Sequence, residues 1–294
     1  MGSLEGRVAA ITGAGRGIGR EHALLFASEG AKVVVNDLGS AGDGSGSDAS
    51  AAQAVVDEIT AAGGEAVAHT DDISTWHGAS SLVGAAVDSF DRLDVLVNNA
   101  GILRDAFLAA MSEAEWDAVL QVHLKGHFLG MRHAAEHFKL RSKAGEEVKA
   151  SIINTASASG TYLPNPGQVN YGAAKAGIAA MSLVAAQELG RYGVRVNAIA
   201  PAARTRLTED VPMIGEMMKA PEEPGAFDAF DPAHVSPLVA YLASADCAIT
   251  GKLFAVQGGL IAECENWRVG KQFKTDGSWS IDSVADALGA RAPA

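Results

Sequence analysis

Residues 8–28 read VAAITGAGRGIGREHALLFAS, in which a short apolar run is followed by a glycine-rich turn and then by a stretch with helical spacing. Glycines at such a turn let the backbone bend sharply and approach a pyrophosphate, whose charge then lies at the positive end of the helix. The strict G-x-G-x-x-G pattern fails because position 18 is Ile, and the fit is to G-x-x-x-G-x-G through Gly13, Gly17 and Gly19. The stretch predicts a strand, a dinucleotide-binding turn and a helix.

An acidic residue ends the second apolar run. Asp37 lies 18 positions after Gly19. A carboxylate there would accept hydrogen bonds from the adenosine ribose hydroxyls, and its charge would repel the 2′-phosphate of NADP. We therefore expect NAD to be the cofactor.

Seven short apolar runs rich in Val, Ile and Ala alternate with longer stretches that fit helices. They lack the alternation of apolar and polar residues, as expected of parallel strands covered on both faces. This order predicts an α/β fold of the Rossmann type, with a doubly wound parallel sheet of seven strands flanked by helices. The predicted strands are Val8–Ile11, Lys32–Val35, Ala66–Ala68, Val95–Val97, Ser151–Ile153, Val194–Ile199 and Leu253–Val256.

Two stretches interrupt this alternation. Residues 38–50 read LGSAGDGSGSDAS and are predicted to form a flexible surface loop, because Gly, Ser and Asp dominate them. Residues from about 202 to 231 are expected to form a mobile apolar flap over the substrate. No repeat or second core is apparent, so the sequence predicts a single domain over residues 1–294, with a C-terminal extension from about residue 260. The apolar side chains of the flap include Met213, Met217, Met218 and Phe227.

The overall charge excludes some classes of partner. The chain has 23 Lys plus Arg against 35 Asp plus Glu, and a net charge of -12 would repel nucleic-acid backbones and anionic lipid. Cys247 and Cys264 have no metal-ligand spacing, and neither a targeting segment nor a membrane-spanning run is apparent. We expect a small-molecule substrate, no nucleic-acid or membrane partner, no metal and a cytoplasmic location.

A tyrosine and a lysine four positions apart form the candidate catalytic pair. Tyr171 and Lys175 stand in NYGAAKAG at residues 170–177, and both share one face of the predicted helix. A lysine ammonium and the positive nicotinamide of an oxidised cofactor would both favour the phenolate. Tyr171 is therefore predicted to act as general base toward an alcohol and as general acid toward a ketone, while hydride passes between substrate and nicotinamide.

Small hydroxyl residues follow the fifth apolar run, in INTASASG at residues 153–160. A hydroxyl there can polarise the substrate oxygen. Together with the glycine turn, with NNAG at residues 98–101 and with Tyr-x-x-x-Lys, this arrangement resembles the short-chain dehydrogenase/reductase family over almost the whole chain.

The resemblance implies a role for each matching residue. Ser157 would orient the substrate, Tyr171 would be the acid/base, and Lys175 would hold the nicotinamide ribose and lower the pKa of Tyr171. Members of the family are usually tetramers, built through helices that correspond to about residues 112–138 and 168–189, so a homotetramer is expected. The residues implied to bind the cofactor are Gly13, Arg16, Gly17, Ile18, Gly19, Asp37, Asp72, Ile73, Asn99, Ala100, Gly101, Tyr171, Lys175 and Thr205.

Three positions depart from the family pattern. Ser157 lies one residue further from Tyr171 than is usual, and it is preferred to Ser159 on its spacing to the following glycine. His123 occupies the position of the family's usual fourth catalytic residue, an Asn, so a proton relay there stays open. Pro201-Ala202 replaces the usual Pro-Gly after the sixth strand.

Smaller features resemble one subfamily. NDLG at residues 36–39, GILRD at 101–105 and VHL at 122–124 are similar to the dehydrogenase parts of the peroxisomal multifunctional β-oxidation enzymes, also called 17β-hydroxysteroid dehydrogenase type 4. The resemblance implies NAD-dependent oxidation of (3R)-3-hydroxyacyl-CoA in fatty-acid or sterol side-chain degradation. The alternative is a 17β-hydroxysteroid or other lipophilic alcohol dehydrogenase. Cations expected to meet the phosphates of coenzyme A are Arg204, Arg206 and Lys219.

A rival class rests on His133, Glu136 and His137, which match the H-x-x-E-H pattern of zinc-dependent hydrolases. With eight histidines in the chain such a spacing arises easily by chance, and no third ligand segment is apparent. A metallohydrolase is therefore the remote alternative. A cofactor-binding module without catalysis is disfavoured, because the serine, the tyrosine and the lysine are all present.

Overall fold

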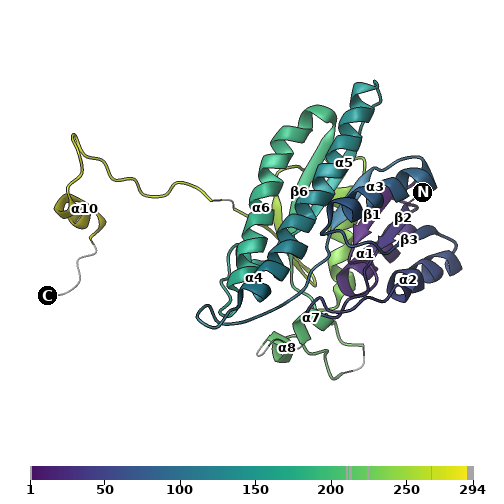
Figure 1. The fold of residues 1–294 in the computed structure, drawn as a ribbon, viewed down its shortest axis with the longest axis horizontal. Helices are drawn as coiled ribbons and strands as arrows, with labels where there is room; N and C mark the ends of the chain where they lie inside the picture. The colour runs from purple at the N-terminus through teal and green to yellow at the C-terminus, as the bar shows by residue number, and fades with distance from the viewer. Residues whose placement is uncertain (1, 210, 212–213, 224, 266, 290–294) are drawn as a thin grey trace. The chain divides into compact units, whose positions relative to one another are not determined.

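The protein is described by a computed structural model that covers residues 2–209, 211, 214–223, 225–265 and 267–289. Its internal contacts divide the chain after Cys264 into two units (Figure 1). The first unit contains the sheet and all the predicted site residues. The second begins at Glu265, and its described residues contain one short helix, α10, which begins after a capping box formed by Ser280 and Ser283.

The first unit is built on an eight-stranded sheet with the order β3-β2-β1-β4-β5-β6-β7-β8. Neighbouring strands from β3 to β7 are parallel, and only β8 is antiparallel to its neighbour in the described sheet. This confirms the doubly wound α/β fold predicted from the apolar runs. The strands are β1 Val8–Thr12, β2 Lys32–Asn36, β3 Glu65–His69, β4 Val95–Asn98, β5 Ala150–Thr155, β6 Val194–Pro201, β7 Leu253–Gln257 and β8 Leu260–Cys264.

The eighth strand corrects the predicted count of seven. Gln257 pairs with Leu260, so Gly258 and Gly259 form a two-residue hairpin turn, and Gly258 has a positive φ of 48°. In the prediction from sequence, this strand falls in the C-terminal extension. Its residues LIAEC are mostly apolar, but the side chains of this short edge strand are mostly exposed, and only its pairing with β7 distinguishes it from the extension that follows.

Helices cover both faces of the sheet. The α-helices are α1 Gly17–Ser28, α2 Ser50–Ala61, α3 Trp76–Phe90, α4 Glu113–Leu120, α5 Gly126–Lys143, α6 Val169–Leu189, α7 Arg206–Glu209, α8 Ile214–Met217, α9 Ser236–Ala243 and α10 Ile281–Leu288. A π-helical turn, η1 Gln121–Lys125, joins α4 to α5 without a break. The short 3₁₀ turns are η2 Ala158–Gly160, η3 Gly190–Tyr192 and η4 Pro232–Val235.

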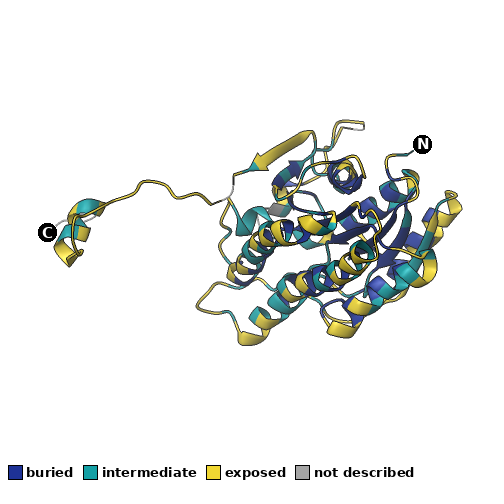
Figure 2. Ribbon diagram, turned by 90° about the horizontal axis from the view of Figure 1, so that it is seen from above, coloured by how far each residue is buried: buried dark blue, intermediate teal, exposed yellow. Residues whose placement is uncertain are grey.

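Alternate residues of β1 enter two separate cores. Ala9 and Ile11 pack with side chains of α1, α2 and α9, whereas Val8 and Ala10 pack with side chains of α3, α5 and α6. Figure 2 shows the central strands in dark blue beneath helices whose outer faces are exposed, whereas β8 is mostly exposed. Burial on both faces explains why the strands appear in the sequence as continuous apolar runs.

The glycine-rich segment of residues 38–50 lies on the surface and is joined to two neighbouring segments. The Leu103 amide donates to the Gly42 carbonyl at 2.9 Å, and Arg206 donates to the Ser40 carbonyl at 3.0 Å. These bonds place the segment beside the chain that follows β4 and beside the start of α7.

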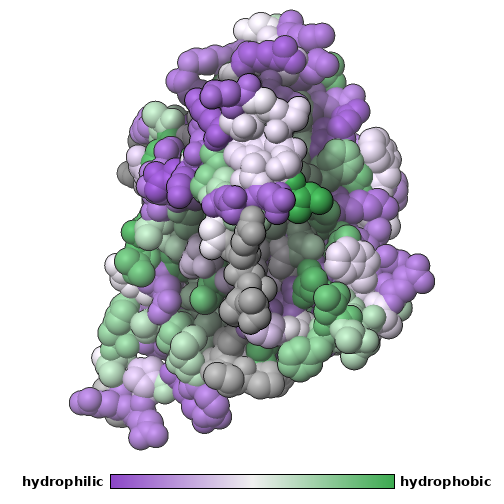
Figure 3. Space-filling view, turned by 90° about the vertical axis from the view of Figure 1, so that its left-hand side faces the viewer, coloured by the Kyte–Doolittle hydropathy of each residue, from purple (hydrophilic) through white to green (hydrophobic). Residues whose placement is uncertain are grey.

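No helix in the described part of the chain is both long and apolar enough to cross a lipid bilayer. On the face drawn in Figure 3, hydrophobic side chains form several separate groups among hydrophilic ones.

Candidate active site

The carboxyl ends of the central strands meet at one edge of the sheet. Thr12 pairs with Asn36, and Asn98 pairs with Asn154, so β1, β2, β4 and β5 end side by side. Between β1 and β4 the chain order of the sheet reverses, which opens a crevice at this edge. The segments that leave these strands carry most of the predicted site residues.

The turn after β1 is built so closely that side chains would not fit. Gly13 has a φ of 64°, and a Cβ there would lie 2.7 Å from the Ala100 Cα. A Cβ on Gly19 would lie 2.2 Å from the Gly13 carbonyl oxygen. No described side chain caps the N-terminus of α1, so its first amide groups remain available to an anionic group. This cradle fits the pyrophosphate of a dinucleotide.

Asp37 lies beside this cradle. Its carboxylate accepts hydrogen bonds from the Gly15 amide at 2.8 Å and from the Gly39 amide at 2.7 Å. These two bonds hold the carboxylate at the end of β2, where it faces the turn. Its position fits contact with the ribose of an adenosine.

Hydrogen bonds hold the segment of Asn99 against the same turn. The Thr12 hydroxyl accepts from the amides of Asn99 at 2.9 Å and Ala100 at 3.0 Å, while the Asn99 side chain donates to the carbonyls of Thr12 and Gly13. Gly101 follows directly. The structure therefore brings Asn99, Ala100 and Gly101 against the glycine turn.

The other predicted cofactor residues differ in what they contact. The Thr205 methyl group lies 3.3 Å from where a Cβ of Gly17 would stand, which places it against the turn. The side chain of Ile18 is partly buried against the core. Arg16 donates to the Ser40 carbonyl. Asp72 accepts from the Ser74 amide, and Ile73 is buried.

The serine, the tyrosine and the lysine come together at the ends of β5 and α6. The Ser157 hydroxyl is hydrogen-bonded to the Tyr171 phenol. Lys175 is 2 % exposed, and its Nζ lies 5.4 Å from the centroid of the Tyr171 ring and donates to the Thr155 carbonyl at 2.5 Å. The i, i+4 spacing on α6 thus places both side chains on the face that meets Ser157.

The charges in this cluster are set mainly by burial. The pKa of Tyr171 is raised to about 12: burial raises it most, the hydrogen bond with Ser157 lowers it, and the negative charge of Asp105 also raises it. Burial lowers the pKa of Lys175 to about 7. The sequence analysis expects Lys175 to lower the pKa of Tyr171; in the protein alone, burial outweighs any such effect, because the ammonium loses much of its own charge.

His123 lies against Tyr171. Its ring meets the tyrosine ring edge-on with centroids 5.1 Å apart, and its Nε2 lies 3.0 Å from the Ile102 nitrogen and 2.8 Å from the Ile102 oxygen. Burial lowers the pKa of His123 to about 3, so the imidazole is neutral. The π-helical turn η1 carries His123 into this position, as such turns often do near functional sites.

Two polar residues near Tyr171 were missed by the sequence analysis. Asp105 lies in the segment after β4, and Gln168, at the start of α6, donates to its carboxylate at 2.8 Å. The stretch GILRD contains Asp105 and was used only for its resemblance to a subfamily. A signal for Gln168 is lacking, since no local pattern relates residues 63 positions apart.

The predicted flap contains α7 and α8, and Met213 lies outside its described residues. Met218 is buried, whereas Met217 and Phe227 are exposed. Arg204 forms an ion pair with Asp228 at 2.5 Å, and Lys219 pairs with Glu216 at 2.7 Å. The guanidinium of Arg204 is therefore held inside the flap by Asp228, and its contact with coenzyme A phosphates stays a prediction.

The residues of the rival zinc pattern have other contacts. His133 packs edge-on against Trp76 with ring centroids 4.6 Å apart, and Glu136 accepts from Arg132 at 2.6 Å. Among the described residues, no three His, Cys, Asp or Glu side chains are grouped so that they could hold a metal ion.

A doubly wound sheet with a dinucleotide cradle after β1 and a Ser-Tyr-Lys cluster beside it defines an oxidoreductase that acts on CH-OH groups with a nicotinamide cofactor. The family model described as short chain dehydrogenase matches residues 7–212, and the chain belongs to this family.

Several known proteins are similar to this chain. The hydroxyacyl-CoA dehydrogenase ChsB1 of Mycobacterium tuberculosis is 46% identical over 97% of this chain and 88% of its own length. The mouse peroxisomal multifunctional enzyme type 2 is 42% identical over 88% of this chain, which spans 33% of that longer protein. The crystal structure of a short chain dehydrogenase from Mycobacterium avium has a TM-score of 0.86 at 52% identity and covers 100% of this chain and 98% of its own.

Proposed function

We propose that the protein catalyses the NAD-dependent oxidation of (3R)-3-hydroxyacyl-CoA in fatty-acid or sterol side-chain degradation. The observation that carries this proposal is the contact of Ser157, Tyr171 and Lys175 beside the glycine turn. The printed names of relatives such as ChsB1 support the choice of substrate class.

Each of the three residues has a role in this proposal. The Ser157 hydroxyl holds the substrate oxygen next to the Tyr171 phenol, and Tyr171 accepts the hydroxyl proton during oxidation or donates it during reduction. Lys175, whose Nζ lies beside the Tyr171 ring, binds the ribose of the cofactor. A bound nicotinamide supplies the hydride acceptor for the alcohol carbon.

The cofactor is proposed to be NAD rather than NADP. The Asp37 carboxylate lies beside the glycine turn and stays held there by the amides of Gly15 and Gly39. Its charge opposes a 2′-phosphate at the same place. The backbone of the turn and the segment from Asn99 to Gly101 would hold the rest of the cofactor.

A turnover screen tests the proposed function. Purified protein is assayed with (3R)-3-hydroxyacyl-CoA of short and long chain, with a 17β-hydroxysteroid and with a simple secondary alcohol, each with NAD and with NADP. We expect the highest kcat/KM for a hydroxyacyl-CoA with NAD. A higher kcat/KM for the hydroxysteroid would replace this function with the alternative, and equal kcat/KM for the simple alcohol and the long hydroxyacyl-CoA would remove the acyl-CoA assignment.

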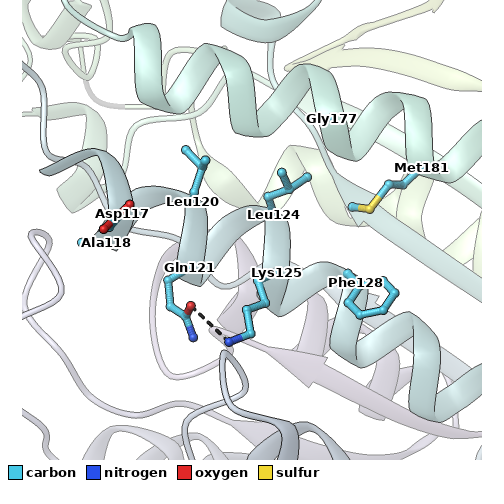
Figure 4. Close-up of a pocket in the computed structure, with 9 residues that line it drawn as sticks. All are labelled: Asp117, Ala118, Leu120, Gln121, Leu124, Lys125, Phe128, Gly177 and Met181. Atoms are coloured by element: carbon cyan, nitrogen blue, oxygen red, sulfur yellow. Dashed lines mark hydrogen bonds between the residues drawn. The ribbon is translucent and has the colours of Figure 1, made fainter. Parts of the chain in front are cut away.

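We further infer that the chain assembles into a homotetramer, using the outer face of α4, η1, α5 and α6. A groove on this face is lined by apolar side chains of Leu120, Leu124, Phe128 and Met181, and Phe128 is 46% exposed (Figure 4). A second copy would cover these side chains, and Gly177 permits a close approach of helices. A cytoplasmic location is also proposed; the two cysteines are free thiols, as a reducing compartment would keep them.

A further inference from the structure

The carboxylate of Asp105 lies close to the reacting centre, yet the proposed chemistry of Ser157, Tyr171 and Lys175 does not use it. Its negative charge is felt by the Tyr171 phenol, whose pKa it raises. Asp105 lies in the segment after β4 and is exposed. A fixed charge here would act on any substrate whose alcohol contacts Tyr171.

Gln168 fixes the orientation of this carboxylate. The buried Gln168 amide donates to Asp105 Oδ2 at 2.8 Å, and its own oxygen accepts from the Ser159 hydroxyl at 2.8 Å and from Asn165 at 3.1 Å. Because Gln168 is 6% exposed and uses both ends of its amide, it has no freedom to rotate. Asp105 is therefore tied to the turn that carries Ser157.

The backbone on either side of Asp105 is held as well. Asn170 is fully buried and donates to the Arg104 carbonyl at 2.9 Å, and the Ala106 amide donates to the Gly167 carbonyl at 2.9 Å. The main chain on either side of Asp105 cannot shift without breaking these bonds.

No cation neutralises Asp105 in the described part of the chain. The neighbouring Arg104 turns its guanidinium toward the Asp43 carbonyl, to which it donates at 2.8 Å. Asp105 is exposed as a residue, and partial burial of its carboxyl raises the pKa while the hydrogen bond from Gln168 lowers it. Two further basic residues lie near Tyr171. Lys175 is buried and donates to the Thr155 carbonyl, and the imidazole of His123 is neutral.

We propose that Asp105 is a specificity-determining residue that rejects substrates with a negative charge close to the alcohol carbon. The site would then accept neutral thioesters and esters of 3-hydroxy acids and discriminate against the free acids. In the thioester, the carbonyl group two carbons from the alcohol is uncharged, whereas the free acid has a carboxylate at that place. Like charges in a partly desolvated site repel strongly enough to decide between two substrates. The phosphates of coenzyme A lie many bonds further away.

This inference rests on the proposed dehydrogenase function. It is tested with (3R)-3-hydroxydecanoate and its methyl ester, which share one carbon skeleton and differ in one charge. Both are oxidised at alkaline pH with saturating NAD by the wild-type protein and by Asp105→Asn. Asparagine removes the charge but keeps an oxygen that accepts from Gln168.

The ratio of kcat/KM for the ester to kcat/KM for the acid is the readout. Both substrates use the same Tyr171, so any change in its pKa cancels in this ratio. We expect the wild type to favour the ester strongly, and the ratio to fall at least about tenfold in Asp105→Asn, as loss of one close like-charge contact predicts. Asp88→Asn, which removes an exposed charge on α3, should leave the ratio unchanged.

A second measurement on the wild type guards against a variant that does not fold. Raising the salt concentration screens the repulsion, so the ratio of kcat/KM for the ester to kcat/KM for the acid should fall by at least about twofold. A ratio that stays within about twofold in Asp105→Asn, or a wild type that oxidises acid and ester equally well, would overturn the proposal. Turnover of hydroxyacyl-CoA in the same preparations would then show that the dehydrogenase function itself still stands. Absence of turnover with every substrate would overturn both.

Discussion

The surroundings of Tyr171 have opposing effects on its pKa. Burial and the charge of Asp105 favour the neutral phenol, while the hydrogen bond with Ser157 favours the phenolate. A phenol with a pKa of about 12 in the protein alone is protonated near neutral pH, so it has a proton to donate and cannot accept one. A positive nicotinamide beside it would favour the phenolate, so oxidation is expected to speed up as pH rises.

Tyr171→Phe tests the proposed acid/base. The change removes the hydroxyl and keeps the ring, so we expect kcat to fall at least about a hundredfold, the range typical for loss of a positioned proton donor. The dissociation constant of NAD should stay within about twofold, measured by fluorescence titration. Retention of more than a few per cent of kcat would remove Tyr171 from this role.

Lys175→Met tests the cost of the buried ammonium. Burial lowers the pKa of Lys175 from 10.5 to about 7, so between these values the unfolded chain binds more protons than the folded chain. The cost is complete below about pH 7 and vanishes as pH rises toward 10.5. We therefore expect Lys175→Met to raise the Tm near pH 7 by at least about 3 °C, and to lose this advantage at alkaline pH.

Thermal unfolding of both proteins without cofactor, across this pH range, measures the difference. Because the lysine is also proposed to hold the ribose, the variant should bind NAD more weakly. A wild type that is the more stable protein at neutral pH would contradict the stated cost of burial.

At the scale of elements, the end of β2 is proposed to decide the cofactor. Asp37→Asn keeps an oxygen for one of the two amides that Asp37 now accepts from, and it removes the charge. We expect the ratio of kcat/KM with NAD to kcat/KM with NADP to fall at least about tenfold, because a like-charge contact with the 2′-phosphate is lost. Steady-state kcat/KM with each cofactor measures this. Better turnover with NADP in the wild type would refute the choice of NAD.

The junction of α4, η1 and α5 depends on a glycine in another segment. A Cβ on Gly101 would lie 2.4 Å from the His123 Cε1, so Gly101→Ala must displace the ring that packs on Tyr171. We expect a loss of about 1–3 kcal/mol in the free energy of unfolding, measured by urea denaturation, together with lower kcat. Gly84→Ala on α3, where a Cβ meets nothing within 4 Å, should instead be neutral or stabilising. Equal effects of the two changes would show that the clash is unimportant.

At the scale of the whole molecule, the groove on α4, η1, α5 and α6 is proposed to be covered by another copy. Phe128→Glu places a charge among its apolar residues, and we expect the mass measured by light scattering at micromolar concentration to drop below that of a tetramer. Trp76→Glu changes another exposed aromatic, on α3, and should not alter the mass. A wild type that is monomeric under these conditions would contradict the inferred assembly.

The sequence by itself determined most of the architecture, because its signals are local. Strands covered on both faces appear as apolar runs, the glycine turn directly follows one of them, and the spacing of Tyr171 and Lys175 places them on one helical face. Seven strands and the family could be predicted in this way.

Only the tertiary structure decided the remaining features. The pairing with β7 that makes residues 260–264 a strand of the sheet is a tertiary contact, and the partners Asp105 and Gln168 are 63 positions apart. The sequence shows that Arg204 is a cation, but only the folded flap shows that it pairs with Asp228. The pKa of Tyr171 likewise depends on burial and on charges brought together from distant segments. Contacts between residues far apart in the chain follow from packing, and no local period encodes them.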